Sequence, residues 1–412
     1  MKYGCIGEHL KHSFSKEIHN ALADYEYELC EVAREELDDF ATRRDFLAIN
    51  VTIPYKELII PHLYYIDDGA KAIGAVNTVV NRDGRLYGYN TDFYGMESLL
   101  RHASIDLSGK KVVILGTGGT SKTAAAVAMA GGAREILRVS RGGREGAITY
   151  EELYEHHSNA EIIINTTPSG MFPNIFDTPV DISRFPNLLG VIDAVYNPLR
   201  TPLISAAKKR GIPAEGGLYM LVAQAVRASE IFTDTEYTNG TLDDVFGKIR
   251  RSKENIVLIG MPASGKSTVG KILAKQTGRP FIDTDKLIVE RTGKEITNIF
   301  AECGESGFRD IEAEAVREVS AMTSAVIATG GGAILREENV KALRENGRLY
   351  FIDRPLEKLI PTISRPLSSD RESIKKRYDE RYGIYTDVCD EKIDADCSPR
   401  EVARRIMENF EK

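Results

Sequence analysis

The sequence predicts an α/β protein in which helices cover the faces of parallel sheets. Apolar strand patterns alternate with helical patterns along the chain, for example over 110–115, 121–130 and 135–140. Such alternation is typical of parallel sheets. Two glycine-rich segments, 116–121 and 260–267, each lie between an apolar strand and a helical stretch. A chain of 412 residues is long enough for about two to four domains.

Composition narrows the class of protein. Apolar residues make up 42% and charged residues 28%, as in ordinary soluble proteins, and the net charge of −7 gives no reason to expect nucleic acid or an anionic membrane as a partner. The sequence has no signal-peptide pattern and no apolar run of about 18 residues. Its five cysteines are scattered, which argues against a disulfide framework or a zinc site. We therefore expect a cytoplasmic protein with small-molecule partners; the oligomeric state stays open.

Changes of pattern divide the chain into three units. A short basic stretch, 247–254, separates an amphipathic helix from a new apolar strand and predicts a linker. Before it we expect one unit over about 1–100 and a second over about 101–235. A helix over about 236–250 is expected to return to the first unit. The third unit is expected over 255–412.

The first glycine-rich segment predicts a dinucleotide site in the second unit. It follows a buried strand and opens a helix, so backbone N–H groups and the positive helix end would face a pyrophosphate. The second unit is therefore predicted to be a Rossmann-type domain. The residues expected to contact the cofactor here are Gly116, Gly118, Gly119, Thr120 and Ser121, the last in place of a third glycine.

The end of the next strand predicts NADP rather than NAD. An acidic residue usually stands there to bind the ribose 2′-hydroxyl of NAD, but this chain has Ser140 and Arg141, with Arg144 close by. A guanidinium matches a phosphate group. The alternative is that Arg141 and Arg144 only solvate a loop.

The second glycine-rich segment, 260–267, matches the P-loop pattern G-x-x-x-x-G-K-[ST] between a strand and a helix. Its backbone would wrap the phosphates of ATP, Lys266 would reach the β- and γ-phosphates, and Ser267 would bind Mg²⁺. The third unit is therefore predicted to be a P-loop nucleotide-binding domain with a central parallel sheet. The residues expected to bind ATP are Gly260, Ala263, Ser264, Gly265, Lys266, Ser267 and Thr268.

The first unit carries polar clusters that are ambiguous one by one. Ser13 and Ser15 have the residue type of helix caps, and residues 90–92 have that of a turn. Lys56 has the features of a solvated helix residue.

Taken in order, these clusters resemble a known family. The motifs S-x-S, NVTxPxKE, GAVNT, NTD, GxGGxS, INTTPSGM, VYNPLRTPL and GGLYMLVAQA follow one another. This order resembles the shikimate dehydrogenase family over residues 1–250. The resemblance implies an NADP-dependent reduction of 3-dehydroshikimate to shikimate, with the substrate-binding domain at 1–100 and the NADP-binding domain at 101–235.

The resemblance also implies roles for single residues. Lys56 and Asp92 would be the catalytic pair, and an ammonium suits this role because hydride transfer leaves negative charge on the substrate oxygen. Ser13 and Ser15 would hold the substrate carboxylate. The remaining substrate contacts would come from Thr52, Asn77, Tyr196 and Gln224, and further cofactor contacts from Thr166, Gly217 and Met220.

The third unit resembles the shikimate kinase family throughout 255–412. The motifs are Asp283-Thr-Asp285, GExxFRxxE with Arg309 and Glu312, the triplet Gly330, Gly331 and Gly332, then Arg365-Pro-Leu and Arg381-x-x-x-Tyr385. The resemblance implies transfer of phosphate from ATP to shikimate, giving shikimate 3-phosphate on the route to chorismate and the aromatic amino acids.

The kinase resemblance implies its own set of roles. Arg309, Arg381 and the glycine triplet would clamp the substrate carboxylate. Lys266 and Asp285 would be catalytic, Asp283 would join Ser267 at Mg²⁺, and Arg365 would meet the transferring phosphoryl group.

Purely structural roles remain as alternatives for these kinase residues. Asp283 and Asp285 are residues that often cap the amino end of a helix. Arg309 and Glu312 are spaced to form an i,i+3 ion pair, and the glycine triplet could form an ordinary loop. Two departures concern nucleotide binding. The segment 355–367 is short with no second arginine before Arg365, and Cys397 stands where family members often have arginine.

The sequence thus predicts a bifunctional enzyme that uses NADP(H), ATP and Mg²⁺. Two alternatives remain. One is a regulatory protein built on the same domains, and the other is an enzyme in which one half acts on quinate or another hydroxy acid. The catalytic side chains are all present in the sequence, which argues against the regulatory alternative.

Overall fold

The computed structural model describes residues 1–10, 13–143, 146–360 and 371–411, and the chain divides into two compact units, Met1–Ile249 and Arg250–Lys412. The division falls inside helix α9 (Thr241–Lys253), where the sequence predicted a linker over 247–254. The helix continues because Val245 and Ile249, four residues apart, are both buried, and its last turn is basic, which suits a helix C-terminus. Among the described residues no helix is long and apolar enough to cross a membrane.

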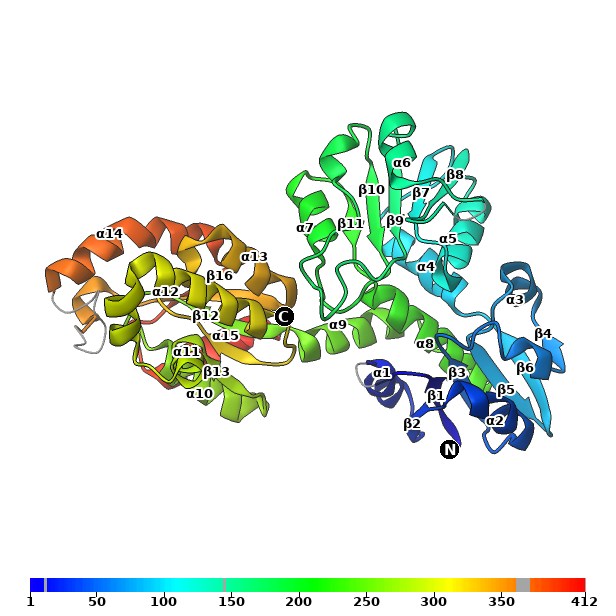
Figure 1. Cartoon of the computed structure of the whole chain (residues 1–412). Helices are drawn as coiled ribbons and strands as arrows, with labels where there is room; N and C mark the ends of the chain where they lie inside the picture. Colours follow the sequence, from blue (N-terminus) through cyan, green and yellow to red (C-terminus); the bar gives the residue numbers. More distant parts are fainter. Residues whose placement is uncertain (11–12, 144–145, 361–370, 412) are drawn as a thin grey trace. The chain divides into compact units, whose positions relative to one another are not determined.

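The predicted α/β class is confirmed, but the first sheet is mixed rather than parallel. Its strand order is β2-β1-β3-β5-β6-β4 (Figure 1). Strands β1, β2 and β3 pair in parallel, whereas β5 is antiparallel to both β3 and β6. The strands are β1 (Tyr3–Gly7), β2 (Tyr27–Glu31), β3 (Ala48–Val51), β4 (Tyr65–Ile66), β5 (Thr78–Arg82) and β6 (Arg85–Tyr89).

A tight turn explains this departure from parallel pairing. Asp83 and Gly84 connect β5 to β6, and both have positive φ, 52° and 79°. A two-residue turn of this kind joins antiparallel neighbours. The helices of this part are α1 (Ser15–Leu22), α2 (Leu37–Arg43) and α3 (Asp68–Ile73), with short 3-10 turns η1 (Arg34–Glu36) and η2 (Ile60–His62).

The second sheet is wholly parallel, in the order β11-β10-β9-β7-β8. Alternate residues of β7 enter two cores. Val112 and Ile114 pack toward α4 and α5, whereas Val113 and Leu115 pack toward α6 and α7. The elements are β7 (Lys111–Leu115), β8 (Glu135–Val139), β9 (Ile162–Asn165), β10 (Gly190–Asp193), β11 (Ala214–Glu215), α4 (Asp92–His102), α5 (Gly119–Ala130), α6 (Tyr150–His156), η3 (Ile182–Arg184) and α7 (Pro202–Lys209).

Helix α8 (Leu218–Thr233) joins the two sheets of the first unit (Figure 1). Its residues Tyr219 and Met220 belong to the core under the second sheet, whereas Ala228 and Phe232 belong to the core under the first sheet. Helices α1, α8 and α9 share a further apolar cluster. One continuous helix therefore packs against both sheets of the first unit.

The second unit has a parallel sheet in the order β13-β14-β12-β15-β16. Ile256 and Leu258 of β12 pack toward α10 and α15, and Val257 and Ile259 pack toward α12, α13 and α14. The strands are β12 (Asn255–Ile259), β13 (Phe281–Asp283), β14 (Val326–Ala328), β15 (Gly347–Asp353) and β16 (Glu391–Asp394). The helices are α10 (Lys266–Thr277), α11 (Thr284–Thr292), α12 (Ile296–Ser320, kinked at Gly304), α13 (Glu337–Asn346), α14 (Arg371–Val388) and α15 (Pro399–Phe410), with η4 (Ala333–Leu335) and η5 (Leu356–Lys358).

Candidate active sites

Strand direction brings the polar motifs of the first sheet to one edge. Lys56 follows the carboxyl end of β3, and Asn77 precedes β5, which runs antiparallel beside β3. Asp92 follows the carboxyl end of β6, which is antiparallel to β5. The three residues therefore lie at the same edge although they are far apart in the chain.

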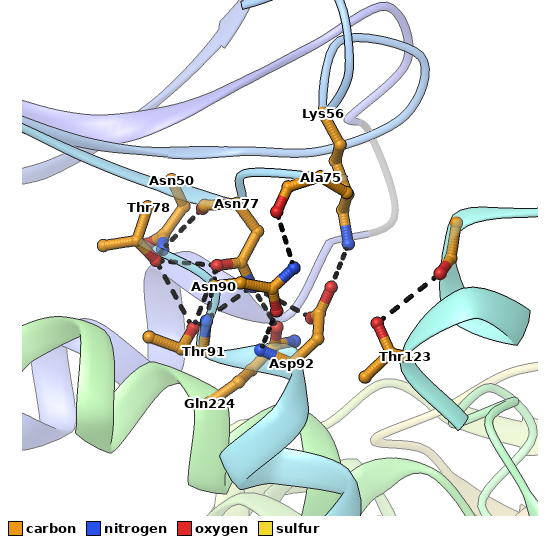
Figure 2. A network of polar contacts seen from close by, with 11 residues as sticks. Asn50, Lys56, Ala75, Asn77, Thr78, Asn90, Thr91, Asp92, Thr123 and Gln224 are labelled. Carbon is orange, nitrogen blue, oxygen red and sulfur yellow. Dashed lines mark hydrogen bonds and ion pairs between the residues drawn. The ribbon is translucent and has the colours of Figure 1, made fainter. Parts of the chain in front are cut away.

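Lys56 and Asp92 form a close, sheltered ion pair. The Lys56 Nζ donates to Asp92 Oδ2 at 2.6 Å, and the side chains are 18% and 5% exposed. Figure 2 shows the lysine reaching from its loop toward the first turn of α4. The reading of Lys56 as a solvated helix residue is thus wrong. Shielding from water strengthens the pair relative to a surface salt bridge.

Asn77 links this pair to α8. Its Nδ2 donates to Asp92 Oδ1 at 2.9 Å and approaches Gln224 Oε1 at 3.2 Å, so Lys56, Asn77, Asp92 and Gln224 lie together (Figure 2). Its Oδ1 accepts from the Thr91 backbone N–H at 2.8 Å. Both ends of the amide are therefore used, and the amide fixes the carboxylate.

A second layer of polar side chains supports Asp92, and the sequence reasoning assigned no role to it. Asn90 accepts from the Asp92 backbone N–H at 3.0 Å and donates to the Ala75 carbonyl at 2.8 Å. Thr78 donates to Asn77 Oδ1, and Asn50 donates to Thr78 (Figure 2). Their shared position at strand ends was the sequence feature that could have identified them as part of the site.

Ser13 and Ser15 lie together at the start of α1. Ser13 Oγ donates to Ser15 Oγ at 3.0 Å and accepts from the Ser15 backbone N–H, the first of α1, at 3.3 Å. The helix-cap alternative therefore holds in part for Ser13. Phe14 between them makes an edge contact with Tyr196, with ring centroids 5.2 Å apart. Burial raises the pKa of Tyr196, which keeps its hydroxyl a donor. Thr52 follows β3, and its backbone N–H donates to the Ile6 carbonyl.

The dinucleotide loop has the close packing that its sequence predicted. Gly116 has a φ of 110°, and a side chain there would come within 2.7 Å of Thr166 Oγ1. Ser121 is buried and donates to the Gly116 carbonyl at 2.7 Å, so it ties the helix to the turn in place of a third glycine. Gly118, Gly119 and Thr120 lie at the amino end of α5. The backbone here fits a pyrophosphate.

An ion pair connects this helix to the segment that carries Lys56. Lys122 Nζ lies 2.7 Å from Glu57 Oε1, next to the catalytic candidate. At the end of β8, Ser140 is buried and accepts from the Gly142 backbone N–H, and Arg141 is exposed. Arg144 lies outside the described residues.

Asp193, which the sequence reasoning missed, connects the loops that follow β9 and β10. It is fully buried and accepts from Asn165 Nδ2 at 2.9 Å, the Val195 backbone N–H at 3.0 Å and Thr201 Oγ1 at 2.7 Å. Asn165 and Val195 directly precede Thr166 and Tyr196 in the chain. Burial raises the pKa of the Asp193 carboxyl to about 7, against the lowering effect of its three donors. The same region holds Gly217, where a side chain would collide with the Ala194 carbonyl, and the buried Met220.

The P-loop of the second unit has a shape that fits phosphates. Gly260 and Gly265 have φ of 146° and 99°, and a side chain at Gly260 would come within 2.9 Å of the Ile352 carbonyl. Lys266 is buried and donates to the carbonyls of Gly260 and Met261 at 2.8 Å. The buried Ser264 Oγ has no partner among the described residues, which suits a loop that closes around a polar ligand. Ala263 lies in the same turn with positive φ, and Thr268 is exposed on α10.

Ser267 and Asp283 meet at the mouth of this loop. Ser267 Oγ donates to Asp283 Oδ2 at 2.6 Å, and both are oxygen donors of the kind that Mg²⁺ prefers. Asp283 also caps α11 through its other oxygen, which accepts from the backbone N–H groups of Asp285 and Lys286. The helix-cap alternative is therefore right for Asp283, and it leaves one oxygen at the loop.

The glycine triplet lines a cavity of about 480 Å³ beside the P-loop. A side chain at Gly330 would come within 2.6 Å of both Asp285 and Glu312, one at Gly331 would meet Pro262, and one at Gly332 would overlap the Arg309 guanidinium. The triplet is therefore not an ordinary loop, because Gly330 and Gly332 leave room for candidate site residues and Gly331 packs against the P-loop.

Two arginines reach this cavity from opposite helices. Arg309 donates to Glu312 at 2.6 Å and to Glu305 at 3.0 Å, and Arg381 donates to the Gly331 carbonyl at 3.0 Å. Burial raises the pKa of Glu312, with Arg309 opposing it. The i,i+3 pair with Glu312 is thus present, and the same arginine lines the cavity. Arg365 lies outside the described residues.

Several residues that line the cavity were missed by the sequence reasoning. They include the apolar walls Val289, Ile296, Phe300 and Phe308, the acids Glu290 and Glu295, and the cations Lys286 and Arg377. Apolar positions at helical spacing look like core in a sequence, and charged helix residues look like a solvated face, so neither kind was distinguishable from an ordinary helix position.

The two units define an oxidoreductase with a Rossmann-type domain joined to a P-loop kinase. Residues 5–79 match the family model of the shikimate dehydrogenase substrate binding domain, and residues 262–411 match that of shikimate kinase. A shikimate dehydrogenase (NADP(+)) of Clostridium beijerinckii is 39% identical over 254 residues, which cover 58% of this chain and 93% of the relative. The chain belongs to the shikimate dehydrogenase family, and its second unit is a shikimate kinase domain.

Solved structures agree with this assignment for the first unit. Shikimate dehydrogenase 1 of Peptoclostridium difficile is similar with a TM-score of 0.56 and 38% identity, over 60% of this chain and 98% of that chain. A shikimate 5-dehydrogenase of Thermus thermophilus, solved with NADP(H) and shikimate, gives a TM-score of 0.54 and 27% identity. The match covers 60% of this chain and 99% of that chain.

We predict that Asp92→Asn lowers kcat for NADPH oxidation roughly 100-fold, because the neutral amide no longer fixes the Lys56 ammonium. Steady-state kinetics with 3-dehydroshikimate measures the loss. The matched control is Asp68→Asn, which breaks an exposed pair with Lys71 and should change nothing. A kcat within threefold of wild type would contradict a catalytic role for the ion pair.

We predict that Asp193 makes the first unit less stable as pH rises. Its pKa is raised to about 7 when folded, above the usual 3.8, so its stabilising effect is full below about pH 4 and is lost as pH approaches 7. In calorimetry of the whole chain, with the dehydrogenase transition assigned by its shift with NADP, Asp193→Asn should remove about 1.4 kcal/mol per pH unit of slope between pH 5 and 6. Identical slopes for both proteins would show that Asp193 is ionised throughout.

Proposed function

We propose that this chain catalyses two consecutive reactions. The first unit reduces 3-dehydroshikimate to shikimate with NADPH, and the second transfers phosphate from ATP to shikimate, giving shikimate 3-phosphate. The observation that carries the proposal is that one chain joins a member of the shikimate dehydrogenase family to a shikimate kinase domain. The contacts of Lys56 with Asp92 and of Ser267 with Asp283 support it. The product of one reaction is the substrate of the other.

In the dehydrogenase, Lys56 is the group that meets the developing charge. NADPH supplies the hydride to the carbonyl carbon, and the ammonium neutralises the substrate oxygen and gives it a proton. Asp92 holds the ammonium at 2.6 Å, and Asn77 holds Asp92. Ser13 and Ser15 donate to the substrate carboxylate, with Thr52, Tyr196 and Gln224 as further contacts.

The glycine-rich loop would hold the cofactor in this proposal. The amino end of α5 faces the pyrophosphate, and Ser140 and Arg141 bind the 2′-phosphate, with Arg144 as a further prediction. Thr166, Gly217 and Met220 shape the nicotinamide side. The tight packing of Gly116 against Thr166 supports this arrangement.

In the kinase, Asp285 orients the acceptor hydroxyl and takes its proton. Arg309 and Arg381 bind the substrate carboxylate against the glycine triplet. Lys266 leaves the loop carbonyls and contacts the β- and γ-phosphates of ATP. Ser267 and Asp283 would hold Mg²⁺, which neutralises phosphate charge. Arg365 keeps its predicted role at the transferring phosphoryl group.

Small-molecule substrates are the partners that both domains imply. A cytoplasmic location and the absence of nucleic-acid partners belong to this proposal, since net charge and scattered cysteines favour them.

A one-pot assay tests the two-reaction proposal. Purified whole chain receives 3-dehydroshikimate, NADPH and Mg-ATP, and NADPH loss and shikimate 3-phosphate are followed together. We predict that wild type gives both signals and that Lys266→Ala keeps NADPH loss but forms no phosphate ester. Lys56→Ala loses at least about 100-fold in NADPH consumption yet still phosphorylates added shikimate. If folded wild type gives neither signal, the regulatory alternative replaces this proposal.

We predict that Arg141→Gln lowers the preference for NADPH over NADH about tenfold, because a charge-assisted hydrogen bond to the 2′-phosphate is lost. The ratio of kcat/KM for the two cofactors is the measurement. Arg101→Gln, at an exposed pair with Glu97, is the control and should leave the ratio unchanged. An unchanged ratio in Arg141→Gln would mean that this side chain only solvates its loop.

A further inference from the structure

Arg377 is a cation at the acceptor cavity that no motif assigns. It lies on α14, half-buried, and lines the cavity of about 480 Å³ together with Arg309, Arg381 and the glycine triplet. It also lines an adjoining cavity of about 340 Å³, whose other walls include Glu305 and Lys376. Arg377 therefore stands at the boundary between the acceptor site and a second polar space.

The position of Arg377 follows from helix geometry. It precedes Arg381 by four residues, and side chains at this spacing share a helix face. Arg381 is anchored to the cavity floor through the Gly331 carbonyl at 3.0 Å. Helix α14 thus presents two guanidinium groups to the cavity, one at the floor and one a turn nearer its amino end.

The charges around the cavity show why a second guanidinium from α14 matters. Five acids line it, namely Asp283, Asp285, Glu290, Glu295 and Glu312, against four cations, Lys286, Arg309, Arg377 and Arg381. Arg309 is already paired with Glu312 at 2.6 Å and with Glu305 at 3.0 Å. An anionic acceptor would meet repulsion from the acids, so the cations of α14 are needed to offset it.

We propose that the Arg377 guanidinium binds the carboxylate of the kinase acceptor together with Arg381, and so makes the site selective for acceptors that carry this group. Arg309 shares the carboxylate but stays tied to its glutamates. This inference rests on the proposed kinase function and adds a specificity residue to it. A planar guanidinium suits a carboxylate better than an ammonium does.

The test compares two acceptors, shikimate and its analogue in which the carboxylate is reduced to a hydroxymethyl group. Arg377→Ala should raise KM for shikimate about tenfold, the effect of losing one charge-assisted hydrogen bond, with KM for ATP within twofold of wild type. The ratio of kcat/KM for shikimate to that for the analogue should fall by the same factor. Arg377→Lys should recover part of the loss.

Lys375→Ala is the matched control, because Lys375 is exposed on the same helix and lines neither cavity. It should leave the ratio unchanged. A ratio in Arg377→Ala that equals the wild-type ratio overturns the inference, whether or not both acceptors are used less well. If wild type itself phosphorylates neither acceptor, the proposed kinase function fails first, and the two failures are thus distinguishable.

Discussion

The direction of the strands is the constraint on which both sites depend. In the first sheet β3 and β6 end, and β5 begins, at the same edge, so Lys56, Asp92 and Asn77 meet there. In the parallel sheets the loops after β7 and β12 emerge at the carboxyl edge, where each runs into the positive end of a helix. No single motif makes a site, and the topology brings the motifs together.

Both sites also require the backbone to approach side chains closely. Gly116 in the first unit and Gly330 and Gly332 in the second each occupy a position where a Cβ atom would strike a polar side chain of the candidate site. The space that the glycines leave is filled by Thr166 in one case, and by Asp285, Glu312 and Arg309 in the other. Buried charges at these sites are paired or hydrogen-bonded, as Asp92 and Glu312 are, which makes their burial tolerable.

Local patterns predicted the elements well, because strand and helix periods and glycine loops are local signals. The α/β class and the strands around both glycine-rich loops follow from them. What they did not predict depends on contacts distant in sequence. The mixed first sheet follows from a two-residue turn at Asp83, and the continuation of α9 to Lys253 follows from burial of Val245 and Ile249. Asp193 ends an apolar strand, and Arg377 lies in a highly charged helix, so neither stands out in the sequence. Only the fold shows that Asp193 connects two loops and that Arg377 lines the cavity.

The central claim is that each unit holds a complete site for shikimate. Calorimetric titration of shikimate into the whole chain, with ADP present and with NADP and ATP left out so that neither reaction runs, tests this claim most directly. The account predicts two equivalents of shikimate per chain, with Asp92→Asn perturbing one binding event and Arg381→Ala the other. Saturation at one equivalent, or loss of both events in either variant, would contradict it.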